Sequence, residues 1–338
     1  MKKARVGIIG CGRISIMHLV SLANLNDCEL ICCCDIKEDR ANKVANEYKI
    51  KPYTNYEEMI NDEQLDAVHI CLPHYLHFPA AKYALEHGVN VLTEKPMTID
   101  YDSAKVLVDL AKAKNLLYGV VFQCRFNNSS KLVKKEISSG RLGKIICARS
   151  ILTWSRPDSY YQESDWKGTW NKEGGGVIID QAIHSIDLVN WIVNSTPVSI
   201  SCSIANHGHK IVKVEDTAEG LIVYENGVKY CFFCMNNYAI DDPIEIEFIC
   251  EKGRVVFNYD DAYVYFKDGR VLEAHQDTDV LSYPGAKDYW GFQHHKEIAQ
   301  FYRSLLHGEK LEISGEECLK TQHLICQIYE EGLKNFRR

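Results

Sequence analysis

The segment Asp180 to Asp187 combines side chains that could move a proton. Asp180 and His184 are four residues apart and Asp187 follows three residues later, so a helix would bring them onto nearly one face. Polar residues on one stripe of an otherwise apolar helix either face water or line a polar pocket. Three interpretations are open: an internal Asp–His hydrogen bond, a metal site without an evident third ligand, or a histidine that the carboxylate makes more basic for proton exchange with a substrate hydroxyl.

The stretch Glu94-Lys95-Pro96 supplies a cation that could stabilise developing negative charge. It directly follows Val89–Thr93, an apolar run that is typical of a buried strand. Ligands gather at the carboxyl ends of the strands in a parallel sheet, which is where Lys95 would lie. We therefore predict that Lys95 faces a ligand, with a lysine on the rim of the sheet as the alternative.

A neighbouring strand end carries further candidates. The run Ala67–Cys71 is followed by Leu72, Pro73 and His77, and the loop that holds them would face the same ligand. His77 also stands where a helix begins, so a capping or solvent-facing histidine is the alternative.

A glycine turn near the start of the chain predicts what the ligand is. The apolar run before it ends in Gly10-x-Gly12, and a helix-like pattern follows from Ile14 to Leu25. Strand, tight turn and helix together direct backbone N–H groups at a pyrophosphate. Ser15 takes the place of a third glycine and is small enough for close packing of helix on strand.

The residue at the end of the next apolar run favours one dinucleotide over another. Asp35 follows Leu30–Cys34, and its carboxylate suits the ribose hydroxyls of NAD and would repel the 2′-phosphate of NADP. Lys37 and Arg40 lie nearby and leave NADP as the less favoured alternative.

The elements that position these residues predict an α/β first domain over residues 1–122. Strand-like and helix-like segments alternate, which is typical of a doubly wound parallel sheet. The expected strands are Arg5–Ile9, Glu29–Cys34, Ala67–Cys71, Val89–Thr93 and Leu117–Phe122, and the later helices are Arg40–Tyr48, Phe78–His87 and Ser103–Lys114.

We predict that residues 123–338 form a second domain of α+β type with an open, mostly antiparallel sheet. The closing helices of this domain could pack back on the first domain. Asn226-Gly227 and Asp268-Gly269 are strong hairpin turns. The expected strands are Ile145–Thr153, Ser199–Ala205, Ala218–Tyr224, Val228–Cys234, Ile244–Cys250, Arg254–Asn258 and Tyr263–Lys267. The expected helices are Asn128–Ser139, Val177–Val193, Gly291–His307 and Gly315–Phe336, with an aromatic loop from Trp154 to Trp170.

Composition excludes some classes of function. The formal net charge of −7 over 338 residues provides no basic surface for nucleic acid, and no apolar run is long enough to span a membrane. The 14 cysteines, without a recognisable export signal, favour reduced thiols and a cytoplasmic location. Cys231 and Cys234 form a lone C-x-x-C that a strand would point to opposite faces, so no metal site is expected there.

The motifs together resemble those of the Gfo/Idh/MocA family, the glucose–fructose oxidoreductase and inositol dehydrogenase group. The resemblance rests on Gly10-Cys11-Gly12 with Ile14 and His18, Cys71-Leu72-Pro73 with His77, Glu94-Lys95-Pro96, Trp166-Lys167-Gly168-Thr169-Trp170, and Gly174-Gly175-Gly176 through Asp180, His184 and Asp187. It implies a Rossmann domain, a C-terminal domain whose open sheet often serves as the interface of a homodimer or homotetramer, and a cis Lys95–Pro96 bond.

The resemblance also implies a site. Its catalytic constellation corresponds to Lys95, Asp180 and His184. The residues expected to bind the cofactor are Gly10, Gly12, Arg13, Ile14, Asp35, Ile36, Arg40, Leu72, Pro73, His77, Glu94 and Lys95. Arg125, Tyr161, Trp166 and His294 are the candidates for substrate contacts. The alternative for Arg125 is closing the domain interface, and for Tyr161 and Trp166 it is structural packing. Because the family oxidises or reduces carbonyl-related carbons with NAD or NADP, we expect no metal.

Residue chemistry agrees with a dehydrogenase that acts on a small carbohydrate or polyol. His184 is the expected proton acceptor because its intrinsic pKa lies near neutrality, and Lys95 would hold the developing alkoxide, although the two could exchange roles. A sugar-nucleotide dehydrogenase or a keto-sugar reductase is the enzymatic alternative. An NAD-binding sensor without catalysis is the alternative of another class.

Overall fold

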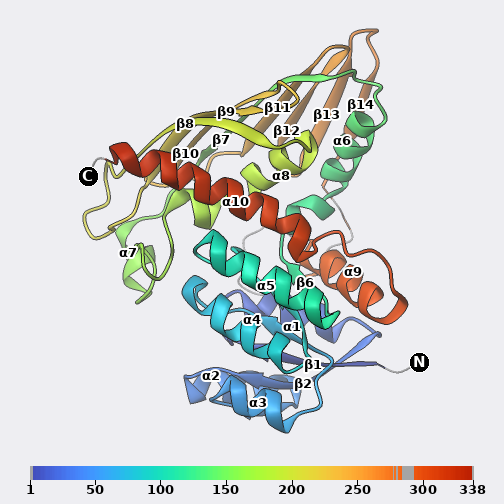
Figure 1. Cartoon of the computed structure of the whole chain (residues 1–338), viewed down its shortest axis with the longest axis vertical. Coiled ribbons are helices and arrows are strands. Elements are labelled where there is room, and N and C mark those ends of the chain that lie inside the picture. The colour runs from blue at the N-terminus through green and yellow to red at the C-terminus, as the bar shows by residue number, and fades with distance from the viewer. Residues whose placement is uncertain (1–2, 277, 279–280, 284–292, 337–338) are drawn as a thin grey trace. The chain divides into compact units, whose positions relative to one another are not determined.

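The protein is described by a computed structural model that covers residues 3–276, 278, 281–283 and 293–336 (Figure 1). It divides into two compact units. The N-terminal unit comprises the described residues up to Gln123 together with 281–283 and 293–322, and the C-terminal unit comprises the described residues from Cys124 to 278 and from His323 onward. Of the expected helix Gly291–His307, the first two residues lie outside the described residues.

The N-terminal unit is built on a six-stranded parallel sheet with the order β3-β2-β1-β4-β5-β6. Its strands are β1 (Ala4–Ile9), β2 (Cys28–Cys34), β3 (Lys51–Tyr53), β4 (Ala67–Ile70), β5 (Asn90–Thr93) and β6 (Tyr118–Val120). The strand order reverses between β1 and β4, which pair in parallel register from Val6 opposite Ala67. This is the doubly wound sheet that the alternating pattern predicted, and its ligand edge lies at the carboxyl ends of β1 and β4.

Helices cover this sheet and bring distant parts of the chain together. They are α1 (Ser15–Ala23), α2 (Glu38–Tyr48), α3 (Tyr56–Asp62), α4 (His77–Glu86), α5 (Tyr101–Lys114) and α9 (His294–His307). The late helix α9 packs against α1. Strand β3 and helix α3 were not predicted, although Asn55 caps α3 by accepting a hydrogen bond from Glu57 N at 2.8 Å.

The C-terminal unit contains an eight-stranded sheet with the order β14-β13-β12-β11-β7-β10-β9-β8. Its strands are β7 (Ile145–Thr153), β8 (Pro197–Ala205), β9 (Thr217–Tyr224), β10 (Lys229–Met235), β11 (Glu245–Cys250), β12 (Gly253–Asn258), β13 (Asp261–Phe266) and β14 (Val271–Ala274). All neighbours are antiparallel except β7 and β10, which confirms the mostly antiparallel sheet. The short strand β14 was not predicted.

One face of this sheet is covered and the other is more open. Helix α8 (Ile183–Val193) packs on β7, and α6 (Asn128–Ser138) packs on β13 and β14 (Figure 1). Residues alternate accordingly along each strand, as in β10, where Cys234 is buried and Cys231 is exposed. The two cysteines therefore point to opposite faces, as their spacing in a strand predicted.

The helix that carries Asp180 departs from the expected regular form. In place of one continuous α-helix from Val177, the chain makes a π-helical turn over Ile178–Ala182 and becomes α-helical only from Ile183. The expected aromatic loop contains the short helix α7 (Asp158–Gln162). The last helix, α10 (Gly315–Gly332), continues in a short 3₁₀ turn over Leu333–Asn335. None of the helices in the described part of the chain is both long and apolar enough to cross a bilayer.

Candidate active site

The glycine turn after β1 fits the close approach of a phosphate group. Gly10 has a φ of +97°, and a Cβ there would lie 2.4 Å from the carbonyl oxygen of Cys71. A Cβ at Gly12 would meet no heavy atom within 4 Å, so the backbone at this residue borders open space. Ser15 closes the turn by donating from its hydroxyl to the carbonyl oxygen of Gly12 at 2.6 Å. Arg13 and Ile14 are exposed beside the start of α1, where the helix dipole favours an anion.

Asp35 lies directly against this turn. Its Oδ2 accepts a hydrogen bond from the backbone N–H of Cys11 at 2.9 Å, and its Oδ1 accepts one from Lys37 N at 2.9 Å. The carboxylate is thus fixed beside the backbone that a dinucleotide would approach. Ile36, which is 85% exposed, and Arg40 follow on the surface. The structure therefore brings the turn and the acidic residue together in the arrangement that suits a ribose hydroxyl.

Glu94 is buried at the end of β5 and is held by donors from three elements. Its Oε1 lies 3.0 Å from His18 Nε2 and 3.4 Å from His294 Nε2, and its Oε2 accepts from the backbone N–H of Lys95 at 3.2 Å. Burial alone would raise the pKa of Glu94, but the hydrogen bonds from His18 and His294 outweigh burial and hold this pKa well below its ordinary value. Glu94 is therefore a carboxylate at neutral pH.

His77 links the two loops that were expected to face the cofactor. Its Nδ1 lies 2.7 Å from the carbonyl oxygen of Pro96, and its Nε2 lies 2.8 Å from the carbonyl oxygen of Leu72. The ring is buried and both of its nitrogens face the main chain. His77 thus ties the Leu72 loop to the Lys95–Pro96 bond, which is cis as the resemblance implied.

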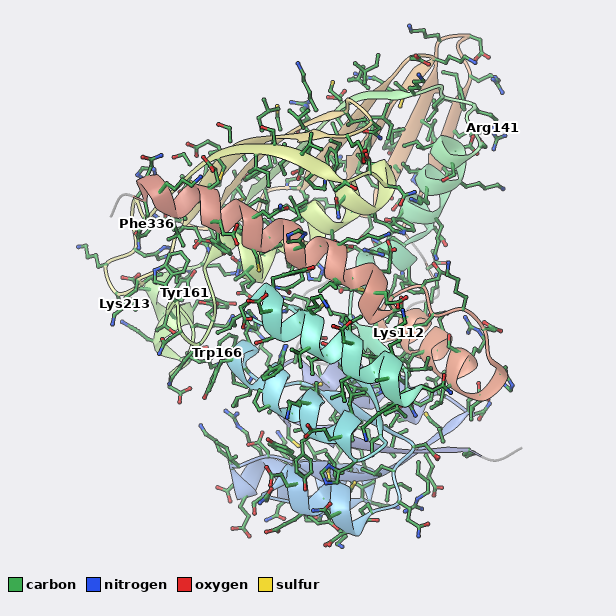
Figure 2. All side chains as sticks on the ribbon, in the orientation of Figure 1. Lys112, Arg141, Tyr161, Trp166, Lys213 and Phe336 are labelled. Atoms are coloured by element: carbon green, nitrogen blue, oxygen red, sulfur yellow. The ribbon has the colours of Figure 1, made fainter. Side chains whose placement is uncertain are left out.

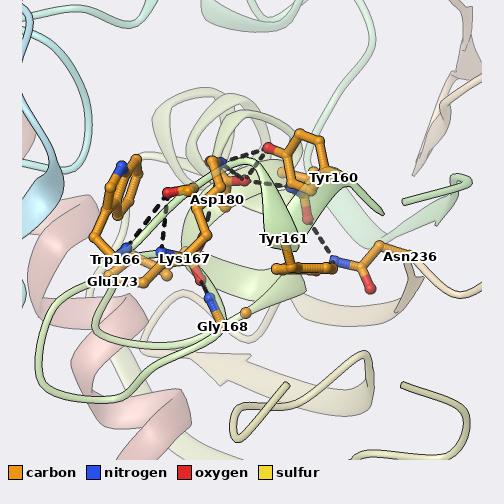
Figure 3. A network of polar contacts seen from close by, with 12 residues as sticks. Tyr160, Tyr161, Trp166, Lys167, Gly168, Glu173, Asp180 and Asn236 are labelled. Carbon is orange, nitrogen blue, oxygen red and sulfur yellow. Dashed lines mark hydrogen bonds and ion pairs between the residues drawn. The ribbon is translucent and has the colours of Figure 1, made fainter. Parts of the chain in front are cut away.

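In the C-terminal unit, Asp180 is held by a lysine that the sequence analysis did not single out (Figure 3). Lys167 Nζ lies 2.9 Å from Asp180 Oδ2 and also contacts the hydroxyl of Tyr160. Tyr160 in turn donates to Asp180 Oδ2 at 2.9 Å, and Gln181 donates to the same oxygen at 2.5 Å. Lys167 stands 13 residues before Asp180, so no helical or strand periodicity could have paired them.

A second carboxylate shares this lysine. Glu173 is buried, with its Oε1 3.8 Å from Lys167 Nζ, and it accepts a short hydrogen bond from Gly168 N. Burial, followed by the nearby charge of Asp180, raises the pKa of Glu173 to about 8. Burial would lower the pKa of Lys167, but Asp180, Tyr160 and Glu173 together outweigh burial and raise it. At neutral pH the cluster therefore consists of a lysine cation, an Asp180 anion and a protonated Glu173.

The start of the helix that carries Asp180 and His184 is fixed by a buried glutamate. Glu215 accepts hydrogen bonds from Gly176 N at 2.9 Å and Ile178 N at 3.1 Å, and from the hydroxyl of Tyr329 at 2.8 Å. A Cβ on Gly176 would lie 1.9 Å from the carbonyl oxygen of Glu215, so a side chain cannot be accommodated there. The π-helical turn follows directly, and such turns occur often at functional sites.

His184 and Asp187 follow on α8, where both are buried. Asp187 binds Arg125 through two hydrogen bonds, from Nε at 2.8 Å and from Nη2 at 2.6 Å. Arg125 was expected to contact substrate. Two of its guanidinium nitrogens instead form a bidentate internal ion pair with Asp187. Lys95 belongs to the N-terminal unit and His184 to the C-terminal unit, so each lies in its own cluster of contacts.

The other expected substrate contacts have different surroundings. Tyr161 is buried, and its hydroxyl accepts from Asn236 Nδ2 at 2.9 Å. Trp166 is partly exposed, with Lys167 Nζ 4.8 Å from its ring centroid, and it lies near Tyr161 in the segment around α7 (Figure 2). His294 is buried beside Glu94. Among the described residues, no group of His, Cys, Asp and Glu is arranged to hold a metal ion.

Relatives of known activity resemble the chain over much of its length. It is 26% identical over 225 residues to 1,5-anhydro-D-fructose reductase of Ensifer adhaerens, a match that covers 66% of this chain and 67% of the relative. It is 26% identical over 246 residues to D-glucoside 3-dehydrogenase of Escherichia coli, with 66% and 67% covered. These matches span about two thirds of the relatives' own length.

A solved structure extends the likeness to nearly the whole chain. The WlbA dehydrogenase of Bordetella pertussis, in complex with NADH and UDP-GlcNAcA, has a TM-score of 0.85 at 25% identity. The match covers 98% of this chain and 97% of that one, so the fold of both units is shared.

Two family models match successive parts of the chain. The model described as "Oxidoreductase family, NAD-binding Rossmann fold" matches residues 4–122, and that of the "GFO/IDH/MocA C-terminal domain" matches residues 130–256. Together these two matches cover most of the chain, and the six-stranded parallel sheet lies within the first of them, so the chain belongs to the Gfo/Idh/MocA family of NAD-binding oxidoreductases.

Proposed function

We propose that this protein is an NAD-dependent dehydrogenase that transfers a hydride between the cofactor and a secondary alcohol of a sugar, cyclitol or glycoside, or the corresponding ketone. The observation that carries the proposal is the presence of all three candidate proton-transfer residues in a chain whose two parts match this family. They are Lys95, Asp180 and His184.

The residues of the N-terminal unit fit a dinucleotide. Gly12 borders open space next to the start of α1, which supports a pyrophosphate at this helix end. Asp35 is fixed beside the same turn, which supports the ribose hydroxyls of NAD and disfavours the 2′-phosphate of NADP. When bound, the nicotinamide supplies the hydride acceptor or donor, and the protein supplies position and charge.

The protein's own side chains would manage the proton. Oxidation of an alcohol releases the hydroxyl proton as the hydride leaves the same carbon. We assign proton acceptance to His184 and stabilisation of the alkoxide to Lys95. Asp180, which Lys167 and Tyr160 keep charged and oriented, would accept a hydrogen bond from a substrate hydroxyl or from His184.

The substrate class follows from the charge of the Asp180 cluster. With Lys167 paired to Asp180 and Glu173 protonated, the cluster is close to neutral, which suits an uncharged polyol better than an acid. The partly exposed Trp166 could offer an aromatic face to a sugar ring. Names of relatives such as D-glucoside 3-dehydrogenase support the same class.

The experiment is a survey of turnover. Purified protein is supplied with NAD or NADP and a panel of polyols, free sugars, glycosides and keto-sugars, and the absorbance of reduced nicotinamide is followed. Turnover of at least one member, faster with NAD, is the expected result. Cofactor binding without turnover of any member would contradict the proposal and favour a sensor.

A sugar nucleotide is the second candidate substrate, because the similar WlbA dehydrogenase was solved with UDP-GlcNAcA. The panel therefore includes UDP-sugars with and without a carboxylate. Exclusive turnover of the UDP-sugars would favour this second candidate.

We also propose a homo-oligomer through the open face of the eight-stranded sheet. Leu221 and Cys231 are exposed on this face, and Ile151, Phe233 and Ile249 are partly exposed there. A broad face with several apolar side chains is typical of a protein interface. Light scattering should give a dimer or tetramer that Phe233→Glu weakens, and a wild-type monomer would contradict the proposal.

The cysteines support a reducing, cytoplasmic location. All 14 of them fall within the described residues, and none of these forms a disulfide. Nine of them are buried, where a thiol packs as a small apolar group.

A further inference from the structure

Behind Glu94, three buried side chains from separate elements form one line of hydrogen bonds. The hydroxyl of Tyr302, on α9, lies 2.8 Å from Nε2 of His69, on β4. Nδ1 of His69 lies 2.7 Å from Nδ1 of His18, on α1. Nε2 of His18 reaches Glu94 Oε1 at 3.0 Å. All of them are fully buried or nearly so, and none belongs to the proton-transfer set assigned above.

The chemistry of these groups permits only one direction along the line. Glu94 is ionised and can only accept, so His18 donates from Nε2. Burial lowers the pKa of His18 and that of His69, so both rings are neutral at neutral pH. A neutral His18 that donates from Nε2 presents a lone pair at Nδ1, and His69 must donate to it. His69 then accepts at Nε2 from the hydroxyl of Tyr302.

The far end of the line indicates what it is for. Tyr302 is fully buried, and burial raises its pKa well above the ordinary value, so its hydroxyl keeps its proton. A line that ends inside the protein does not deliver protons to solvent. It instead aligns three dipoles towards one carboxylate, and hydrogen bonds in such a series strengthen one another.

We propose that Tyr302, His69 and His18 are positioning residues, which together orient the carboxylate of Glu94 and through it the main chain at Lys95. The proposal rests on the proposed function, because it is Lys95 that would hold the alkoxide. The link to Lys95 is its backbone N–H, which donates to Glu94 Oε2 at 3.2 Å. A carboxylate held at one oxygen by the aligned series keeps its other oxygen in place for this bond.

Several ionisable groups face Glu94 and would take part in any pH effect. On its own loop this is Lys95, and from the elements packed around it they are His18 of α1, His69 and Cys71 at β4, His77 of α4 and His294 of α9. Because the two histidines nearest to Glu94 donate to it, removing a donor should raise the pKa of this carboxyl.

The direct test is the tautomer of each ring, which nitrogen-15 NMR of histidine-labelled protein reports without any substrate. His18 is expected as the Nε2–H tautomer and His69 as the less common Nδ1–H tautomer, both neutral around neutral pH. Spectra of His18→Gln and His69→Asn assign the two signals among the 13 histidines. An Nε2–H or a doubly protonated His69 in the wild-type protein would overturn the inference.

Kinetics test the functional part. Tyr302→Phe keeps the ring and removes the first donor, and we expect kcat to fall by about tenfold with little change in the affinity for NADH, since small displacements of a positioned group slow chemistry. His18→Leu removes the donor to Glu94 and should raise the pKa of this carboxyl by about one unit, which carbon-13 NMR of glutamate-labelled protein reports. His18→Gln, which retains a donor near Nε2, should restore most of that shift.

A matched control separates positioning from general stability. Tyr230→Phe also removes a buried hydroxyl, one that lies 2.6 Å from Ser150 Oγ in the C-terminal unit. It should lower the melting temperature without changing the pKa of Glu94 or kcat. The inference fails if Tyr302→Phe and His18→Leu behave in the same way as this control.

A wild-type protein that binds NADH but oxidises no polyol would instead refute the proposed function, while the tautomers could still be read.

Discussion

Each unit keeps a carboxylate charged, but the two units do so by different means. In the N-terminal unit Glu94 is held by the neutral imidazole of His18 and by a backbone N–H, and Nε2 of His294 lies 3.4 Å from the same carboxylate. In the C-terminal unit Asp180 is held by the ammonium of Lys167 and the hydroxyl of Tyr160. Neutral donors stabilise an anion without cancelling its charge, whereas an ammonium cancels it.

The difference assigns separate tasks to the two clusters. Glu94 is ionised beside the backbone of Lys95, so its carboxylate can support a cation. Around Asp180 the charges sum to about zero once Glu173 is protonated. This cluster can hydrogen-bond an uncharged substrate and offers little attraction to a charged one. Substitutions of the charged residues in each cluster test this distinction.

The largest effect is expected from Lys95→Ala. Loss of the cation should lower kcat by at least about 10³-fold, because alkoxide stabilisation and proton transfer are both impaired. NAD affinity should stay within about tenfold, as the turn at Gly12 and the carboxylate of Asp35 are untouched. Stopped-flow hydride transfer and fluorescence titration of NADH measure the two quantities. Lys82→Ala, which removes an exposed partner of Glu86, is the control; equal loss of binding and rate would make Lys95 structural.

Lys167→Met should have the next largest effect and sharpens the contrast directly. Asp180 would lose its counter-charge and its fixed orientation, so kcat/KM for a polyol should fall by about 10²-fold while NADH binding stays the same. Steady-state kinetics with varied polyol measures this. Lys172→Met is the matched control, since Lys172 lies on the same segment and its Nζ donates to the backbone carbonyl of Asp165 at 3.1 Å. An unchanged kcat/KM would show that Asp180 needs no cation.

The parts of this arrangement that could be predicted from sequence are the local ones. Gly10-x-Gly12 with Asp35 predicted a strand, a turn and an acidic partner, because strand and helix patterns and glycine conformations are encoded within a few residues. The run Ile145–Thr153 and the hairpins at Asn226-Gly227 and Asp268-Gly269 were predicted for the same reason. Short elements such as β3 carry too few residues to show a period.

The contacts that hold the site were beyond such prediction. His18 and His69 are 51 residues apart, and Tyr302 follows His69 by 233, so no local spacing relates them. Asp180 and His184 were placed on one α-helical face, but the π-helical turn changes the angle between successive residues up to Ala182. One indication that Lys167 matters was present in the sequence, because it lies in the motif Trp166 to Trp170 on which the family resemblance rests. That motif does not indicate that Lys167 pairs with Asp180.

A smaller effect is expected from Asp35→Ser, which concerns cofactor choice in the N-terminal unit. The carboxylate accepts from the backbone of Cys11 and would meet the ribose, so its loss should weaken NAD and relieve the repulsion of a 2′-phosphate. The ratio of kcat/KM for NAD to that for NADP should drop by about tenfold, the value of one charge-assisted hydrogen bond. Initial rates with each cofactor give the ratio, and Asp39→Ser, on the exposed face of α2, serves as the control. A ratio that does not change would mean that another group selects the cofactor.

The smallest effect, on stability alone, comes from Glu173→Gln and tests whether the C-terminal cluster is neutral. Burial raises the pKa of Glu173 to about 8, above the ordinary value of 4.5, so the folded protein retains a proton that the unfolded chain releases as the pH rises between these values. Wild-type stability must therefore decline over that interval, because the folded state binds the extra proton. Glutamine imitates the protonated carboxyl and cannot titrate. The free energy of unfolding of Glu173→Gln should thus gain about 1 to 3 kcal/mol relative to wild type between about pH 5 and about pH 8.

Urea denaturation at a series of pH values measures this difference. Glu215, whose pKa burial raises to about 7, contributes a decline of the same sign, but it is present in both proteins and cancels in the comparison. Glu86→Gln, at an exposed position, gives the effect of the substitution where burial is absent. If Glu173→Gln and wild type lose stability in parallel, Glu173 is ionised at neutral pH. The Asp180 cluster would then carry a net negative charge, and the distinction between the two units would rest on their donors alone.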